Sequence, residues 1–149
     1  MKNLLSPLSP HLLSALRIMT ALLFLEHGTS KLLNFPFNPQ MHDIAVMSPA
    51  GIAGVLELVG GALLALGLFS RIVAFILSGE MAVAYFMAHA PQGFFPLLNY
   101  GELAIVYSFV FLYLAAAGPG KWSLDGLLSF GRDAAGRGTV TGGQQAVAG

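Results

Sequence analysis

Four glutamates lie within apolar stretches of this 149-residue chain, where a carboxyl group is well suited to proton or metal chemistry. They are Glu26, Glu57, Glu80 and Glu102. A charged side chain at membrane depth costs about 2.5–3.5 kcal/mol on insertion scales, so each one calls for a partner or a function. We expect all four to face the interior of a helical bundle near one depth, where they meet cations, protons or each other.

Basic side chains accompany these acids and widen the chemistry. His27 follows Glu26 directly, Lys31 lies four residues after His27 on the same helix face, and His89 comes further along the chain. One interpretation is proton handling beside a quinone head group. In it the catalytic candidates are Glu26, His27, Glu57, Glu80 and Glu102, and the cofactor-binding candidates are Lys31, His89 and Asn99.

Two other interpretations of the same residues stay open. Glutamates on facing helices can bind a metal, but metal-binding bundles use Glu-x-x-His, and no histidine lies three residues after any of these four glutamates. We therefore predict no metal site. The acids and bases can also pair across helices merely to fix their register, in which case the protein is a non-catalytic membrane scaffold or chaperone-like partner of another protein. Solute or ion passage would need an oligomer, because four helices leave little room for a pathway.

The composition is that of a membrane protein. Hydrophobic residues make up 56% of the chain and charged residues 9%, against about 25% charged in an ordinary soluble domain. The formal net charge is +0 and no basic block is present, which argues against a nucleic-acid partner and for the lipid bilayer. There is no cysteine, so disulfides, thiolate metal sites and thiol relays are excluded, and redox chemistry would need a bound cofactor.

Four segments are long and apolar enough to position these residues as membrane-spanning helices, since a span needs about 20 apolar residues. They are residues 13–33, 51–69, 72–90 and 98–117. The fold class predicted is therefore all-α, a four-helix transmembrane bundle over residues 1–130. Residues 131–149 are small, polar and Gly/Ala-rich, which predicts a disordered cytoplasmic tail.

Basic residues outside the spans fall on one side of this arrangement, which sets its orientation. They are Lys2, Arg71, Lys121, Arg132 and Arg137. Both termini should therefore be cytoplasmic in a multi-pass protein of the bacterial inner (plasma) membrane.

A short internal repeat suggests how the bundle is built. The segments RIMTALLFLE (17–26) and RIVAFILSGE (71–80) share Arg, Ile, Leu and Glu at the same spacing. This pattern is consistent with a duplicated helical hairpin whose halves have the same orientation in the membrane. It places Arg17 and Arg71 at one edge of the membrane, with Glu26 and Glu80 at similar depth.

Three motifs together resemble the DoxX family of small four-helix integral membrane proteins. They are Arg then Gly-x-x-Lys (Arg17, Gly28, Lys31), Gly-x-x-Glu followed by a glycine-rich run and a basic residue (Gly54, Glu57, Gly60, Gly61, Gly67, Arg71), and Asn-x-Gly-Glu-Leu then Gly-Pro-Gly-x-Trp-Ser-Leu-Asp (Asn99, Gly101, Glu102, Gly118, Trp122, Asp125). Some members are similar to membrane subunits of quinone-linked thiosulfate oxidation, and others accompany redox-stress proteins. The resemblance implies a membrane redox-associated subunit, with a quinone as the cofactor and a redox protein or a second copy as its partner.

Overall fold

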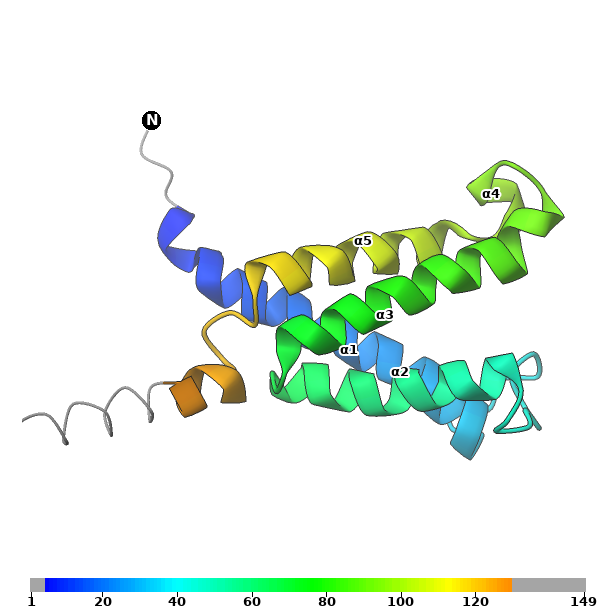
Figure 1. The fold of residues 1–149 in the computed structure, drawn as a ribbon, viewed down its shortest axis with the longest axis horizontal. Helices are drawn as coiled ribbons and strands as arrows, with labels where there is room; N and C mark the ends of the chain where they lie inside the picture. The colour runs from blue at the N-terminus through cyan, green and yellow to red at the C-terminus, as the bar shows by residue number, and fades with distance from the viewer. Residues whose placement is uncertain (1–4, 130–149) are drawn as a thin grey trace, which may run out of the picture.

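The computed structural model describes residues 5–129, so the predicted tail at 131–149 lies outside the described residues. A 3-10 turn, η1 (Ser6–Leu8), leads into the long helix α1 (Ser9–Leu33). The other elements are α2 (Pro49–Leu66), α3 (Ser70–Ala84), the π-helical turn η2 (Tyr85–His89), the 3-10 turn η3 (Ala90–Gln92), α4 (Pro96–Asn99) and α5 (Glu102–Ala117) (Figure 1).

The all-helical, four-span prediction is confirmed. Three helical stretches are long and apolar enough to cross a membrane, namely Ser6–Leu33, Pro49–Leu66 and Ser70–Gln92, and the apolar helix Glu102–Ala117 is shorter. Large apolar side chains on all four remain exposed, for example Leu23, Val59, Phe75 and Phe109. Such a surface is stable against acyl chains, so the chain is an integral membrane protein in contact with the lipid bilayer.

The bundle consists of two helical hairpins. Helix α1 makes its most extensive contacts with α2, and α3 makes its most extensive contacts with α5. In the first hairpin, Gly28 allows the close approach, since a Cβ on it would lie 2.5 Å from the backbone nitrogen of Leu58. In the second, the hydroxyl of Ser78 donates to the Ser108 carbonyl at 2.8 Å, and the hydroxyl of Ser108 donates back at 3.0 Å.

An arginine binds the end of each hairpin in an equivalent way. Arg17 of α1 is fully buried and donates to the carbonyls of Leu64 and Ala65 at the end of α2. Arg71 of α3 donates to carbonyls in the last turn of α5, including that of Ala115 at 2.9 Å. Carbonyls in the last turn of a helix lack the usual N–H donor four residues on, and a cation there also opposes the negative end of the helix dipole. The equivalence agrees with the repeat in the sequence.

The segment after α5 joins the two hairpins at the same end of the molecule. Arg17 also donates to the Pro119 carbonyl at 2.8 Å, and the Asp125 carboxylate accepts the backbone N–H groups of Phe69 and Ser70, each at 2.8 Å. Burial opposes ionisation of Asp125, but these N–H donors and the nearby Arg17 charge outweigh it and lower the pKa of this carboxyl. We call this the turn end, after the turn at Gly67–Phe69, and the opposite end the loop end.

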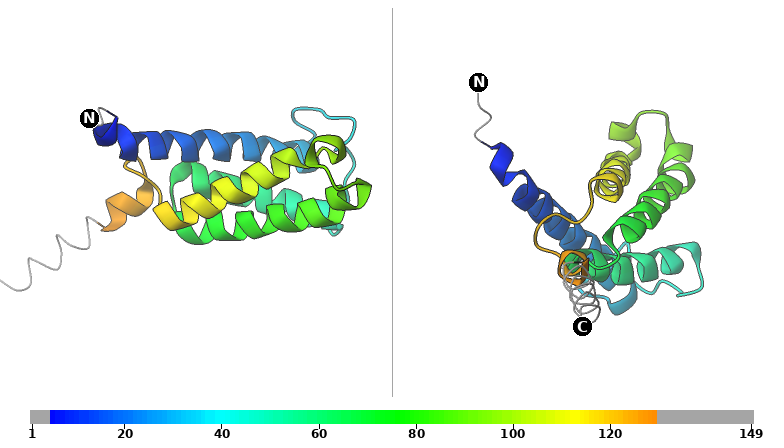
Figure 2. Two further views of the ribbon diagram at one scale, coloured as in Figure 1. Left: turned by 90° about the horizontal axis from the view of Figure 1, so that it is seen from above. Right: turned by 60° about the vertical axis from the view of Figure 1, so that its left-hand side comes forward.

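The two seams between the hairpins are closed to different extents. On the α1–α5 side, Phe24 packs edge-on against Tyr107 and Phe111, with ring centroids 5.4 and 4.9 Å apart. On the α2–α3 side, the buried side chain of Leu77 fills the space over Gly60, which closes the seam near the turn end. Beyond that contact the two helices diverge towards the loop end (Figures 1 and 2). We call the space there the α2–α3 gap.

Candidate functional site

A cavity of about 910 Å³ lies between the hairpins in the half of the bundle nearer the loop end. Its volume falls in the range of about 300–1,000 Å³ that is usual for small-molecule sites. Most of its walls are aliphatic or aromatic, with contributions from α1, α2, α3, η2 and α5. The ionisable side chains that line it are His27, Lys31, Glu57, Glu80, His89, Tyr100 and Tyr107. A second hollow, of about 530 Å³ near Leu12 and Tyr113, has no acid, lysine, arginine or histidine in its lining.

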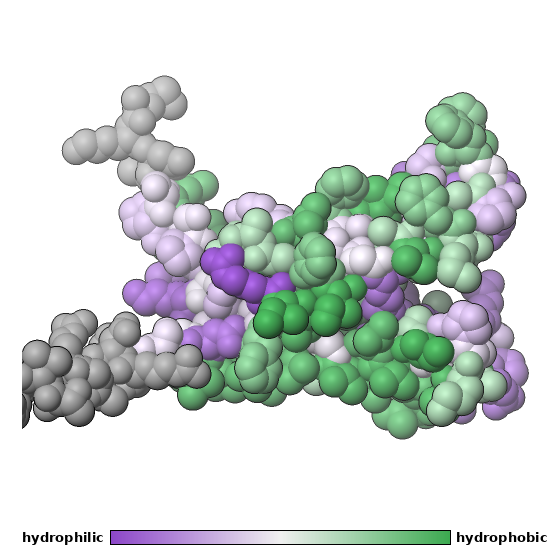
Figure 3. All heavy atoms as spheres, viewed as in Figure 1, coloured by the Kyte–Doolittle hydropathy of each residue, from purple (hydrophilic) through white to green (hydrophobic). Residues whose placement is uncertain are grey.

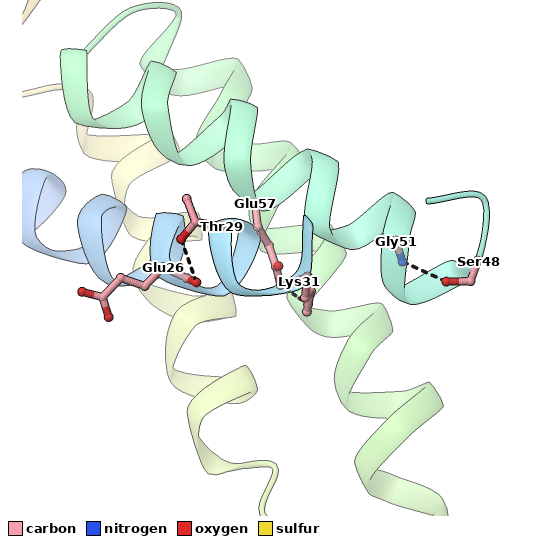
Figure 4. Close-up of polar contacts among 6 residues, drawn as sticks. All are labelled: Glu26, Thr29, Lys31, Ser48, Gly51 and Glu57. Carbon is pink, nitrogen blue, oxygen red and sulfur yellow. Dashed lines mark hydrogen bonds and ion pairs between the residues drawn. The ribbon is translucent and has the colours of Figure 1, made fainter. Parts of the chain in front are cut away.

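The polar floor of the cavity consists of Lys31, Glu57 and Glu80, of which Lys31 and Glu57 form an ion pair. Nζ of Lys31 lies 2.6 Å from Oε1 of Glu57, and the two side chains are only 14% and 3% exposed (Figure 4). Lys31 sits one turn after Gly28, whose missing side chain lets α1 approach the backbone of α2. The ammonium group carries three N–H donors, of which this bond uses one.

Glu80 of α3 faces the same cavity without a partner of its own. Within residues 5–129 neither of its buried carboxylate oxygens accepts a hydrogen bond, and Oε2 of Glu57 is also buried and without one. Glu57 and Lys31 are close enough to act electrostatically on Glu80. Buried polar atoms in proteins are nearly always hydrogen-bonded, so three carboxylate oxygens beside one ammonium group form a site with unmet bonding capacity.

Two histidines, His27 and His89, and two tyrosines, Tyr100 and Tyr107, complete the ionisable part of the lining. His27 lies edge-on to the ring of Tyr107, with centroids 6.4 Å apart. Nδ1 of His89 lies 2.9 Å from the carbonyl oxygen of Asn99, which can only accept, so the proton is on Nδ1 and Nε2 is an acceptor when the ring is neutral. Tyr85 stacks on His89 at 6.4 Å and steadies the ring.

Two of the four glutamates do not take part, so the prediction that all four face the interior at one depth is wrong. Glu26 is exposed, and its carboxylate points away from Lys31 and Glu57 (Figure 4). Neighbouring residues on a helix point about 100° apart, and here His27 takes the direction of the cavity. Glu102 is also exposed because α5 begins at this residue, after Tyr100 with its φ of 58° has ended α4.

Asn99 is fully buried but does not line the cavity. Its side-chain amide donates to the carbonyl of Gly93 at 2.7 Å, and its Oδ1 accepts from the N–H of Gly101 at 2.8 Å. It therefore shapes the connection between η3 and α5 rather than touching a ligand. In the described part of the chain, no three histidine, aspartate or glutamate side chains are arranged to hold a metal ion.

The sequence reasoning missed several residues that build the site. Phe24 and Tyr107 form its α1–α5 wall. Arg17 and Asp125 occur in the motifs quoted from the sequence, but their contacts at the turn end were not predicted. Tyr107 and Phe111 lie four residues apart on one face of the last span, a spacing that would have indicated an aromatic wall. No sequence signal pairs Asp125 with residues 69 and 70, which lie more than fifty positions earlier.

Comparisons with known proteins find a family and a relative for this chain. The DoxX family profile matches residues 12–90. This chain belongs to the DoxX family. The DoxX match covers α1 to η2 and so includes Lys31, Glu57 and Glu80. An uncharacterized protein of Haemophilus influenzae is 50% identical over 127 residues, which cover 83% of this DoxX chain and 95% of the relative. No solved structure matches the chain.

Proposed function

We propose that this DoxX protein is a membrane subunit of a quinone-linked redox system whose cavity binds the quinone head group. The observation that carries the proposal is the polar floor of Lys31, Glu57 and Glu80 at the base of an otherwise apolar cavity. A quinone ring matches this combination, because its faces are apolar and its two carbonyl oxygens need donors. The N–H groups of Lys31 that are not bonded to Glu57 are such donors, and Lys31 lines the cavity.

The remaining polar residues have roles that follow from their places. Reduction of a quinone takes up two protons, and we assign their transfer to Glu80 and His27, two lining groups outside the ion pair that can hold and pass protons. Glu57 fixes the direction of the Lys31 ammonium. His89 contributes the acceptor Nε2 near the loop end and is positioned by its bond to Asn99.

The electrons must come from elsewhere, which defines the partner. The chain has no cysteine, and none of its other side chains is an ordinary two-electron donor. A second redox protein, or a cofactor that such a protein carries, would supply them. With basic residues gathered at the turn end, the orientation proposed is both termini in the cytoplasm of a bacterium and the cavity in the outer half of its inner membrane.

The test is to purify the protein in mild detergent, extract its bound lipids for quinone, and titrate the protein with a short-chain benzoquinone. We expect co-purified quinone and saturable binding that Glu80→Gln and Lys31→Met weaken. Glu26→Gln is the matched control, because it changes an exposed carboxylate on α1 and should leave the affinity unchanged.

Two results would overturn the proposal. The first is a protein with neither co-purified quinone nor saturable binding. The second is a set of folded Glu57→Gln and Glu80→Gln variants that support the cellular role of the protein as well as the wild type does. Either result would favour the alternative of a non-catalytic membrane scaffold, in which the Lys31–Glu57 pair only fixes helix register.

A further inference from the structure

The walls of the cavity differ in how they meet the lipid. Towards α1 and α5 the cavity is backed by the buried rings of Phe24 and Tyr107, which are in edge-on contact, and Leu103 of α5 is an aliphatic lining side chain that is also exposed. Towards α2 and α3, aliphatic side chains that line the cavity are also exposed on the outside of the bundle. These are Ile52, Leu56, Ile76, Val83 and, in η2, Met87, whose exposed fractions are 36–65%.

Small residues leave the α2–α3 gap open between those aliphatic side chains. Ala53 of α2 and Ala84 of α3 both line the cavity, and neither is fully buried. The seam is filled only nearer the turn end, where Leu77 lies over Gly60. Figure 3 shows a small hydrophilic patch near the middle of the bundle, with hydrophobic surface around it. The cavity thus borders the acyl chains on this side of the bundle, with the buried polar floor at its base.

We propose that the α2–α3 gap is a lateral entrance, and that its occupant is the apolar tail of an amphiphile whose hydrogen-bonding head group lies at Lys31, Glu57 and Glu80. This inference rests on the proposed function and adds the route and the tail. A ligand dissolved in the bilayer reaches the floor without crossing water. Its tail then stays between α2 and α3, in contact with the surrounding lipid. Its head group leaves the bilayer and contacts the Lys31–Glu57 ion pair.

The experiment places a large ring in the gap and compares ligands with and without a tail. Ala53→Trp and Ala84→Trp fill the gap from its two sides, and Ala62→Trp puts the same ring on the lipid-exposed face of α2, outside the cavity lining. Each variant is reconstituted in nanodiscs and titrated with a dimethoxy-methyl-benzoquinone that carries a decyl chain and with the same ring without the chain. Dissociation constants are calculated from the concentration of each ligand in the lipid phase, because the two ligands partition differently into the bilayer.

In the two gap variants we expect the decyl compound to bind about tenfold more weakly or worse, a loss of at least about 1.4 kcal/mol, because the tail can no longer leave the cavity. The tail-less ring should lose clearly less affinity in the gap variants than the decyl compound does, since Ala53 and Ala84 also line the cavity. Ala62→Trp should bind both compounds normally. An equal loss of the two compounds in both gap variants would overturn the lateral entrance. Normal binding of the decyl compound to both folded gap variants, or an equal loss in Ala62→Trp, would overturn the lateral entrance. Failure of both compounds to bind the wild type would instead overturn the proposed function.

A further measurement keeps the inference testable where a tryptophan variant fails to fold. A decyl compound with a photoreactive group at the end of its tail should label residues of α2 and α3 at the gap in the wild type. Labelling confined to α1 and α5 would overturn the entrance. Retention of ordinary phospholipid in the gap that the decyl compound does not displace would also overturn it, since the occupant would then be an acyl chain of the bilayer.

Discussion

Removing the charge of Lys31 should destabilise the protein mainly because the buried carboxylate of Glu57 then lacks its ion-pair partner. In Lys31→Met the apolar stem is kept and the charge is lost, so Glu57 remains 3% exposed with no cation within reach. Breaking a buried ion pair from one side costs about 3–5 kcal/mol, whereas replacing both partners with apolar residues is often neutral. We therefore expect Lys31→Met to lose about 3 kcal/mol or more, and Lys31→Met with Glu57→Leu to recover most of that loss.

The assay is reversible unfolding by SDS in mixed micelles, followed by the helical circular dichroism signal, for the wild type, both single variants and the double variant. Glu26→Gln serves as the control for removal of an exposed carboxylate. A loss below about 1 kcal/mol for Lys31→Met, the value usual for an exposed pair, would refute the reasoning. So would a double variant that costs the sum of its two single variants, since the two side chains would then act independently.

Three further predictions use the same assay. Arg17→Leu should cost at least about 3 kcal/mol because it strands buried carbonyls, and Arg71→Leu should cost less because Arg71 is exposed. Gly28→Ala should cost about 1–3 kcal/mol through the clash with Leu58, whereas Gly79→Ala, with nothing within 4 Å of its Cβ, should be neutral or slightly stabilising. Because its folded pKa is lowered, Asp125 adds stability above its unfolded pKa that is lost as the pH falls through the folded pKa, and Asp125→Asn should flatten that acidic limb.

The architecture was readable from the sequence because membrane spans carry the strongest of all local signals. Runs of apolar residues between prolines and glycines placed all four spans within a few residues of α1, α2, α3 and α5. The Arg-to-Glu repeat was a weaker signal, yet Arg17 and Arg71 bind equivalent helix ends. Every backbone group in a span must be satisfied within its helix, which leaves few folds for such a pattern.

The site was only partly readable, since the direction of a side chain depends on how helices rotate against each other. The positions of the four glutamates within their spans predicted that they lie at one depth in the membrane. Glu26 and Glu80 occupy the same place in the repeat, but the rotation of α1 turns Glu26 outwards and that of α3 turns Glu80 into the cavity. The start of α5 at Glu102 depended on a backbone conformation at Tyr100 that carries no glycine signal. The pairing of Lys31 with Glu57 likewise follows from the crossing of α1 and α2 at Gly28, which is a property of two helices together.

The two hairpins are joined by polar contacts at the turn end and lie apart at the loop end. The hydrogen bonds between the two hairpins within residues 5–129 gather at the turn end, where they involve Arg17, Asp125 and the segment that follows α5. The halves of α2 and α3 nearer the loop end carry mainly apolar side chains there, so a wider separation would replace contacts between these side chains with contacts to lipid and, among the described residues, would break no polar bond between the two helices. We therefore expect the separation of α2 and α3 at the loop end to be the easiest feature of the fold to deform, and to depend on the thickness and lateral pressure of the membrane rather than on the solution on either side.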